Sequence, residues 1–416
     1  MTKKSIRSLE LKGQRVLARA DFNVPLDANK TITDDRRIRQ FLPTLKYIVD
    51  HGGRAILMSH LGRPKGDPEK DKEFSLKPVA ARIGELIGKP CGFVHNCIGP
   101  DADAAVGKLK DGEVLLLENL RFHKAETVID KAEKNPDGEL TPEQTRQKDD
   151  FAAALAKHGD IYVNDAFGTC HRNHVSMYDV ALRIPKGRRV LGFLVEKELK
   201  YLGEAVNNPK RPFVAILGGA KVSDKIKVIK NLLPRVDQIL IGGAMTYTFW
   251  AAQGISVGKS LCETDKIDLA RELLKQSGGK IHLPVDSVAG AELKEGVATK
   301  VVEGPLPADL MGLDVGPKTL AMYREYVSKA GTIVWNGPVG AFETKPFEKG
   351  TFTLAHMIAD ATAKGCISVI GGGDSAAAAE KCGLADKFTH ISTGGGASLT
   401  FLEGDKFDTL EILDNA

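Results

Sequence analysis

Short runs of β-branched and leucine residues recur along the chain, and each is followed by a turn-forming segment and then by a longer stretch with helical spacing. Continuous apolar runs of this length are typical of strands buried on both faces, and their alternation with helices favours parallel sheets. We place strands at 16–18, 55–58, 92–94, 114–117 and 161–163, and then at 213–217, 239–241, 281–283, 332–335, 367–370 and 389–391. The pattern predicts an α/β fold built from two doubly wound domains.

A helix with one apolar face separates the two groups of strands. Its apolar residues are Leu191, Leu194, Val195, Leu199, Leu202 and Val206, a spacing that places them on one side of a helix. Pro185 precedes this helix and Asn207-Asn208-Pro209 ends it. We therefore expect a first domain over 1–188, a hinge helix over 189–208 and a second domain over 209–396.

The composition is that of an ordinary globular protein. Of the 416 residues, 42% are hydrophobic and 27% are charged, and no apolar run approaches the roughly 18 residues that a membrane span needs. No apolar stretch follows Lys3, Lys4 and Arg7, so we expect no signal peptide and a cytoplasmic protein. The charged segment 124–150, which contains Asn135-Pro136-Asp137-Gly138, is expected to be an irregular surface excursion.

Charge and glycine are distributed unevenly between the two halves. The net charge of +4 is too small and too mixed for nucleic acid or an anionic membrane to be the main partner. Residues 1–208 carry 35 basic and 30 acidic residues with seven of the ten histidines, whereas residues 209–416 carry 23 and 24. Glycine follows the opposite trend, with 17 in the first part and 26 in the second. We expect the two halves to bind different ligands.

Arginines recur where the predicted strands of the first half end. In open parallel sheets ligands bind at the carboxyl ends of the strands, and four such ends each deliver an arginine. They are Arg19, Arg63, Arg121 and Arg172, and Arg36-Arg37 follows the first of them. A single loop arginine is most often a solvated surface charge, but convergence from several loops favours a site for phosphate or carboxylate.

The strand ends of the second half are rich in glycine instead. These segments are 218–221, 242–244, 336–340, 371–375 and 394–397. Glycine lets the backbone approach a ligand closely, and the helix N-terminus that follows offers N–H donors to phosphates. A single glycine pair is also common in packing between helix and sheet, but five in one domain indicate a phosphate-binding surface.

Four other features of the sequence do not indicate a site. Gly254–Ser260 is one residue short of the P-loop spacing and follows a helix-like segment, and no GxGxxG follows a strand with an acidic residue about 20 positions later. The six cysteines form no CxxC pair, so we expect free thiols. Cys170, His171 and His174 lack further ligands at motif spacing, so we expect no zinc there.

Five motifs occur in an order and spacing that identify a family. They are Arg19-Ala20-Asp21-Phe22-Asn23-Val24-Pro25, Ser59-His60-Leu61-Gly62-Arg63-Pro64, Gly218-Gly219-Ala220-Lys221-Val222, Trp335-Asn336-Gly337-Pro338 and Gly372-Gly373-Asp374. With them the chain resembles phosphoglycerate kinase from about Arg15 to Ser398. The resemblance implies two Rossmann-like domains with parallel sheets joined by a helix hinge, a tail at 397–416 that returns to the first domain, and a monomer. It also implies reversible phosphoryl transfer between 1,3-bisphosphoglycerate with Mg-ADP and 3-phosphoglycerate with Mg-ATP.

The resemblance assigns roles by position. Asp21, Asn23, Arg37, His60, Arg63, Arg121 and Arg172 would bind 3-phosphoglycerate, with His171 and His174 on the same face. Gly219, Lys221, Lys225, Gly243, Leu313, Asn336, Gly340, Glu343, Gly372, Gly373, Asp374 and Ser375 would bind ATP or ADP, with Asp374 as the Mg²⁺ ligand. The catalytic groups would be Arg37, Lys221, Gly373 and Gly395. Ala244, Thr246 and Ala341 depart from the family's usual residues, a difference that bears on the nucleotide contacts.

The implied reaction needs no general base, because its acceptor is a carboxylate that is already ionised at neutral pH. We expect direct in-line transfer on domain closure, without a phosphoenzyme. Two residues have simpler alternatives: Asp374-Ser375 as a helix cap, and Asp21 as a structural partner of Arg19. A dehydrogenase and a non-catalytic anion-binding protein are the alternative functions. Nicotinamide absorbance changes would support the first, and anion binding without nucleotide dependence would support the second.

Overall fold

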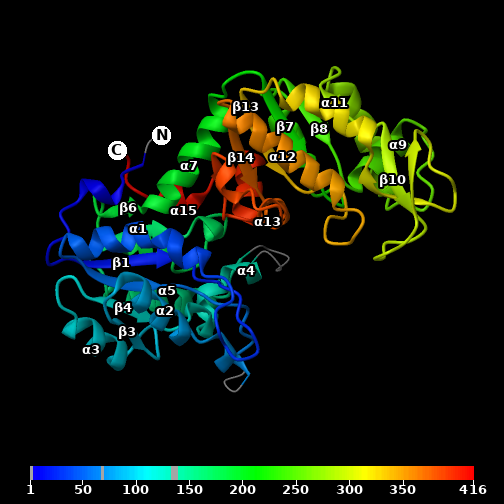
Figure 1. Ribbon diagram of the computed structural model, residues 1–416. Coiled ribbons are helices and arrows are strands. Elements are labelled where there is room, and N and C mark those ends of the chain that lie inside the picture. The colour runs from blue at the N-terminus through cyan, green and yellow to red at the C-terminus, as the bar shows by residue number, and fades with distance from the viewer. Residues whose placement is uncertain (1–2, 67–69, 133–138) are drawn as a thin grey trace. The chain divides into compact units, whose positions relative to one another are not determined.

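The structure is a computed structural model, and the chain divides into two compact units (Figure 1). It describes residues 3–66, 70–132 and 139–416. Unit 1 comprises Met1–Glu198 and Lys406–Ala416, and unit 2 comprises Leu199–Asp405. Each unit contains a parallel sheet with helices packed on it, which confirms the predicted α/β fold of two Rossmann-like domains.

The parallel sheet of unit 1 has six strands within the described residues, in the order β3-β4-β2-β1-β5-β6. The strands are β1 (Arg15–Ala20), β2 (Arg54–Met58), β3 (Cys91–Val94), β4 (Val114–Leu117), β5 (Ile161–Asp165) and β6 (Arg189–Leu191). The helices are α1 (Arg36–Asp50), α2 (Lys77–Ile87), α3 (Pro100–Lys108), α4 (Ile129–Ala132), α5 (Pro142–Ala156), α6 (Asp179–Arg183), the first part of α7 (Phe193–Asn207) and α15 (Asp408–Glu411). Residues 16–20 of β1 are all buried in this central strand, which pairs on both sides, and this burial accounts for the apolar run Val16-Leu17-Ala18.

The parallel sheet of unit 2 also has six strands in the described part of the chain, in the order β15-β14-β13-β7-β8-β9. The strands are β7 (Phe213–Leu217), β8 (Gln238–Ile241), β9 (Ile281–His282), β13 (Thr332–Asn336), β14 (Ile367–Gly371) and β15 (His390–Ile391). The helices are α8 (Ile226–Leu232), α9 (Met245–Ala252), α10 (Ile267–Gln276), α11 (Pro317–Val327), α12 (Lys349–Ala363), α13 (Gly373–Lys381) and α14 (Gly396–Leu402). Alternate residues of β7 and β13, among them Ile216 and Trp335, form a core with Tyr323 of α11 and Leu354 of α12.

A small antiparallel sheet in unit 2 was not predicted. β10 (Asp286–Gly290) pairs with β11 (Thr299–Glu303) on one side and with β12 (Met311–Val315) on the other. Four of the five residues of β11 are exposed, and β12 is interrupted by Gly312 and Asp314. Neither segment therefore has the continuous apolar run by which the buried parallel strands were found.

The boundaries around the hinge differ from the predicted ones. The segment 189–191 is strand β6, which pairs with β5, so helix α7 begins only at Phe193. Residues 397–405, which we assigned to the returning tail, belong to unit 2. They do so because α14 packs against α8, where Asn231 Nδ2 donates a hydrogen bond of 2.9 Å to the Leu402 carbonyl. Only the segment from Lys406 onward joins unit 1.

The segment 124–150 is also more regular than predicted where it is described. Helix α5 covers its last residues and begins with a capping box in which Thr141 and Gln144 exchange hydrogen bonds, followed by Pro142. The predicted turn at 135–138 lies outside the described residues. No helix in the described part of the chain is both long and apolar enough to cross a membrane.

In each parallel sheet the first strand lies at the centre, and the chain order reverses beside it. β1 lies between β2 and β5, and β7 lies between β8 and β13. Ligands of α/β proteins bind in the crevice at the carboxyl ends of such strands. This topology brings the arginine-bearing segments after β1 and β5 together in unit 1. It likewise brings together the glycine-rich segments after β7 and β13 in unit 2.

Asp165, at the end of β5, makes the stability of unit 1 dependent on pH. Its Oδ1 accepts hydrogen bonds from the N–H groups of Leu194 (2.9 Å) and Val195 (3.1 Å) in the first turn of α7, while its buried Oδ2 has no partner. Burial raises the pKa of this carboxyl to about 7, above the roughly 3.9 expected in the unfolded chain. A raised carboxyl pKa means that the charged form destabilises the native state, so stability is lost as the pH rises from about 4 to about 7.

We expect Asp165→Asn to remove this dependence. Between pH 5 and pH 8 the unfolding free energy of the variant should gain about 2–3 kcal/mol relative to wild type, from the pKa difference integrated over that range. Urea unfolding of both proteins at the two pH values measures this difference. The other titrating groups contribute equally to the unfolding free energy of both proteins, so their contributions cancel in the comparison. Parallel pH profiles would contradict the assignment.

Candidate functional site

Asp21 is the centre of a charged network beyond the end of β1. Its Oδ2 accepts a 2.6 Å hydrogen bond from Arg37 Nη1, and its Oδ1 accepts one of 3.1 Å from the Asn23 N–H. Burial alone would raise its pKa, but His60, Arg37 and Arg19 lower the pKa to about 2. Asp21 is therefore an ionised carboxylate that holds Arg37 in place. The sequence also allows Arg19 as the structural partner of Asp21, but the ion pair of Asp21 is formed with Arg37.

Arg37 lies in the first turn of helix α1, and its position is electrostatically unusual. That turn contains no acidic residue and also carries Arg36 and Arg39, although the positive end of the helix dipole favours acidic residues there. Arg36 pairs with Asp34 at the surface, whereas Arg37 is half-buried against Asp21. A placement that does not favour helix stability is typical of a functional residue.

His60 follows β2 and contacts the same network. Burial lowers the pKa of its imidazole well below the usual range, so the ring is neutral at neutral pH. The fully buried Arg19 lies with Nη2 at 3.2 Å from His60 Nδ1, and its Nε donates to Ser176 Oγ at 2.9 Å. The buried Arg19 thus holds the buried His60 ring in place beside Asp21.

Arg121 and Asn23 are joined through the backbone of Gly62. Arg121 Nη1 donates to the Gly62 carbonyl at 2.8 Å, and the Gly62 N–H donates to Asn23 Oδ1 at 2.8 Å. Burial, together with nearby Arg19 and Arg172, lowers the pKa of Arg121 to about 10. Its Nε is buried without a hydrogen-bond partner, which points to a further acceptor such as a ligand or water.

The segment after β5 contributes Arg172, His171 and His174. Arg172 Nη1 lies 3.7 Å from Asp130 and the fully buried His174 lies 3.3 Å from it, so Asp130 holds both, a role that the sequence analysis missed. Burial, with Arg172 and His174 nearby, lowers the pKa of His171 to about 4. The Nδ1 atoms of His171 and His174 are both buried without a partner.

Six of the seven residues predicted to bind 3-phosphoglycerate thus meet at one surface of unit 1. Arg63 is the exception: its side chain is exposed, and no hydrogen bond or ion pair connects it to the described residues. The arrangement holds several guanidinium groups and neutral imidazoles around one ionised carboxylate. Such a set can bind a ligand that carries both a phosphate and a carboxylate.

In unit 2, glycine-rich segments surround a cavity of about 670 Å³. Its lining includes the predicted residues Gly219, Lys221, Lys225, Asn336, Gly372, Gly373, Asp374, Ser375 and Gly395. Lys225 Nζ donates to Asn336 Oδ1, which leaves the buried Asn336 Nδ2 without a partner on the cavity wall. The side chains of Lys221 and Asp374 are exposed at this cavity. A cation, free N–H donors and one carboxylate together suit a metal-bound polyphosphate. We call this cavity of about 670 Å³ the phosphate-type cavity.

Two of these residues differ in role although they are neighbours. The N-cap of helix α13 is Gly372, with a φ of +90°, so Asp374 is not its capping residue. Ser375 is fully buried, and its Oγ accepts a 2.6 Å hydrogen bond from the Gly337 N–H. Ser375 therefore fixes the loop after β13, while Asp374 remains available to a ligand.

The glycines of this surface fall into two classes. A Cβ atom at Gly218 would lie 2.0 Å from the Pro338 carbonyl oxygen, and one at Gly243 would lie 2.5 Å from the Gly219 carbonyl oxygen. These glycines are needed for close packing of one loop on another. By contrast, a Cβ at Gly373 or Gly395 would meet no atom within 4 Å, so these two face open space where a ligand can approach.

This difference predicts opposite effects of two glycine substitutions. Gly373→Ala should leave the melting temperature unchanged or slightly higher, because alanine favours the helix, but should lower turnover at least ten-fold, because its methyl group would enter the open space of the cavity that a ligand is expected to fill. Gly243→Ala should lower the melting temperature by several degrees, since its φ is +72° and its Cβ meets backbone. Thermal unfolding and steady-state turnover measure both effects. Wild-type turnover of Gly373→Ala would show that Gly373 does not face a bound ligand.

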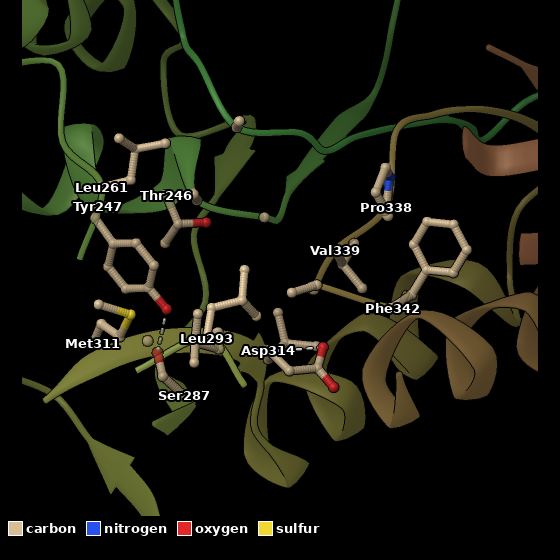
Figure 2. Close-up of a pocket in the computed structure, with 18 of the residues that line it drawn as sticks. Thr246, Tyr247, Leu261, Ser287, Leu293, Met311, Asp314, Pro338, Val339 and Phe342 are labelled. Atoms are coloured by element: carbon tan, nitrogen blue, oxygen red, sulfur yellow. Dashed lines mark hydrogen bonds between the residues drawn. The ribbon is translucent and has the colours of Figure 1, made fainter. Parts of the chain in front are cut away.

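A second, mainly apolar cavity of about 580 Å³ adjoins the first, with Gly219, Ala220, Pro338 and Asp374 lining both. Figure 2 shows Tyr247 and Met311 on one side of it and Pro338, Val339 and Phe342 on the other. The predicted residues Gly243, Leu313, Gly340 and Glu343 also line it, as do Ala244, Thr246 and Ala341. An apolar slot next to a phosphate-type cavity matches the two ends of a nucleotide.

The sequence analysis missed several residues of this slot. Tyr247 OH lies 3.1 Å from Ser287 Oγ in β10, and Asp314 in β12 accepts hydrogen bonds from the N–H groups of Val315 (2.9 Å) and Gly350 (2.6 Å). Burial raises the pKa of Asp314 to about 7. Since β10 and β12 form the unpredicted antiparallel sheet, Ser287 and Asp314 had no predicted element to position them.

Comparison with known proteins agrees with this geometry. The family model described as phosphoglycerate kinase matches residues 6–405. The chain is 51% identical to the phosphoglycerate kinase of Chlorobium phaeobacteroides, with all of both chains covered, and 51% identical to that of Lactobacillus acidophilus, with 97% of each covered. Its fold is similar to the solved structure of phosphoglycerate kinase from Coxiella burnetii, at a TM-score of 0.85 and 37% identity over 99% of this chain and 98% of that one.

The corresponding structure from Pyrococcus horikoshii gives a TM-score of 0.79 at 32% identity, again over 99% of this chain and 98% of the other. The family model covers nearly the whole chain, and the relatives match over their full lengths. These findings show that the chain belongs to the phosphoglycerate kinase family of enzymes, which catalyse reversible phosphoryl transfer in glycolysis.

Proposed function

We propose that this chain transfers the γ-phosphoryl group of Mg-ATP directly to the carboxylate of 3-phosphoglycerate, and in reverse the acyl phosphate of 1,3-bisphosphoglycerate to Mg-ADP. The observation that carries the proposal is the separation of two complementary sites. Unit 1 has a network of arginines around Asp21, and unit 2 has a glycine-rich cavity beside an apolar slot. The first suits a phosphorylated acid and the second suits a nucleotide.

The reaction is a single displacement at phosphorus. A carboxylate oxygen of 3-phosphoglycerate forms a bond to the γ-phosphorus as the bond to the β,γ-bridging oxygen breaks, and the electron pair of that bond leaves with ADP. No proton has to move, because both the attacking and the leaving oxygens are ionised at neutral pH. Asp21, with its pKa of about 2, is also ionised and acts by holding Arg37.

Catalysis then rests on charge and alignment. The three equatorial oxygens of the transferring group carry negative charge that Arg37 from unit 1 and Lys221 from unit 2 would stabilise. Backbone N–H groups at Gly373 and Gly395, two glycines at which a Cβ would meet no atom within 4 Å, would contribute further donors. Arg121, Arg172 and His60 would bind the substrate phosphate, and Arg63 would join them from its exposed loop.

The residues around Asp374 fit a magnesium ion that arrives with the nucleotide. Within the described residues no group of three or more histidine, cysteine, aspartate or glutamate side chains forms a protein cage. Mg²⁺ is commonly bound by one or two carboxylates together with substrate phosphates, and Asp374 is an exposed carboxylate on the phosphate-type cavity. When bound, the ion would neutralise charge on the β- and γ-phosphates.

Each ligand site belongs to one unit, so transfer requires that the units bring their ligands together and exclude water. Small-angle scattering with each ligand alone and with both should show compaction only with both. An unchanged radius of gyration with both ligands bound would count against this step.

The direct mechanism is tested by the stereochemistry at phosphorus. A chiral thiophosphoryl group transferred from ATP should reach 3-phosphoglycerate with inverted configuration, and incubation with radiolabelled ATP without acceptor should leave no label on the protein. Retention of configuration, or a labelled side chain that passes its phosphate to 3-phosphoglycerate, would establish a phosphoenzyme instead.

A further inference from the structure

Thr246 carries a buried hydroxyl that the protein leaves without a partner in the wall of the apolar slot. It lies in the first turn of α9, and its side chain is 1% exposed. Its Oγ1 has no hydrogen-bond partner, and in Figure 2 this oxygen points into the cavity. A threonine in a helix commonly donates to a carbonyl three or four residues earlier, but this hydroxyl does not.

The other buried polar side chains that line the slot, those of Tyr247, Ser287 and Asp314, already have partners within the protein. The hydroxyl of Tyr247 pairs with Ser287, and the two carboxylate oxygens of Asp314 accept backbone N–H groups of Val315 and Gly350. Among the residues that line this cavity, all of which are described, Thr246 alone has a buried polar side-chain atom without a partner. Buried hydroxyls are normally hydrogen-bonded, so this one points to a ligand.

The slot indicates the chemistry of that ligand. Its walls are apolar, with Leu313, Met311 and Val339 among them, and it opens onto the phosphate-type cavity. A planar heterocycle with polar atoms on its edge would bury its faces against these side chains and need a partner for one edge atom. A hydroxyl can both donate and accept, so it can pair with a ring nitrogen or with an exocyclic group.

We infer that the Thr246 hydroxyl hydrogen-bonds a heteroatom of the purine base of ATP or ADP and thereby strengthens binding of the base. This inference rests on the proposed function, in which the slot holds the base and the adjoining cavity holds the phosphates. It makes Thr246 a base-binding residue of the nucleotide site.

Calorimetric titration of the full-length protein with Mg-ADP tests the inference. Thr246→Val removes the hydroxyl at constant shape and should weaken Mg-ADP about five-fold, the effect of one neutral hydrogen bond. Thr246→Ser keeps the hydroxyl and should restore the affinity to within two-fold of wild type. Binding of magnesium tripolyphosphate, which has no base, should be the same in all three proteins.

Thr332 provides a matched control. Its Oγ1 is also buried without a partner in unit 2, at the start of β13, but it does not line the slot. Thr332→Val should leave Mg-ADP affinity unchanged. Without ligand, both valine variants should melt no lower than wild type, because neither loses a hydrogen bond within the protein.

The outcomes separate this inference from the proposed function. If Thr246→Val binds Mg-ADP as tightly as wild type, or weakens tripolyphosphate equally, the hydroxyl does not contact the base. If its unliganded melting temperature falls well below that of Thr332→Val, the hydroxyl has a structural partner, and the inference is also overturned. If wild type does not bind Mg-ADP at all, the proposed function itself fails.

Discussion

Replacing Arg37 by alanine should lower kcat by about 100- to 1,000-fold, the usual effect of removing one group that stabilises transition-state charge. The guanidinium is held at 2.6 Å from the ionised Asp21, which fixes its direction before substrate binds. Arg37→Lys retains the charge but not the paired geometry and should recover only part of the rate. Steady-state kinetics with 3-phosphoglycerate and Mg-ATP measure both variants.

Arg36 is the matched control for this substitution. It is the neighbouring arginine on the same helix turn, but its guanidinium pairs with Asp34 at the surface and is 54% exposed. Arg36→Ala should keep kcat within about three-fold of wild type, as a surface substitution does. A kcat of Arg37→Ala close to that of Arg36→Ala would remove Arg37 from the catalytic machinery.

Replacing Lys221 by alanine should also lower kcat by about 100-fold or more, with a smaller change in the affinity for Mg-ADP. The exposed Lys221 side chain lines the phosphate-type cavity, as Gly219 and Asp374 do. A charge used mainly in the transition state affects kcat more than binding. Kinetics combined with calorimetric titration of Mg-ADP distinguish the two effects.

Lys230 supplies the comparison for Lys221. It is exposed on helix α8 and does not line the phosphate-type cavity. Lys230→Ala should therefore show wild-type kcat and wild-type Mg-ADP affinity. If Lys221→Ala instead weakens Mg-ADP as much as it slows turnover, Lys221 acts in ground-state binding and not in transfer.

The parallel sheets could be predicted from the sequence because their strands are buried on both faces. Every strand that we placed in the sequence is found, since a run such as Phe213–Leu217 has no polar position to obscure it. The strand at 189–191 was missed because it begins with Arg189, whose guanidinium is satisfied by the carbonyls of Ile184 and Leu182. The antiparallel strands were missed because they are exposed or interrupted by polar residues.

The structure brings most of the predicted site residues together, but their contacts could not be predicted from the sequence. Recurrence of arginine and glycine at strand ends indicated both surfaces, and the order of the motifs indicated the family. The sequence could not separate Gly218, which is needed for loop packing, from Gly373, which faces open space, because both are glycines in similar turns. Nor could it place Asp130 against Arg172 and His174, since those contacts join segments more than 40 residues apart in the chain.

The most direct test of the central claim is ADP formation from Mg-ATP by the purified chain with 3-phosphoglycerate, with glycerate and with no acceptor. The two-site account predicts turnover with 3-phosphoglycerate and close to none with the other two, because the arginine network of unit 1 requires the substrate phosphate to align the carboxylate. A protein that binds both Mg-ATP and 3-phosphoglycerate yet forms no ADP would contradict it, and so would equal turnover with glycerate.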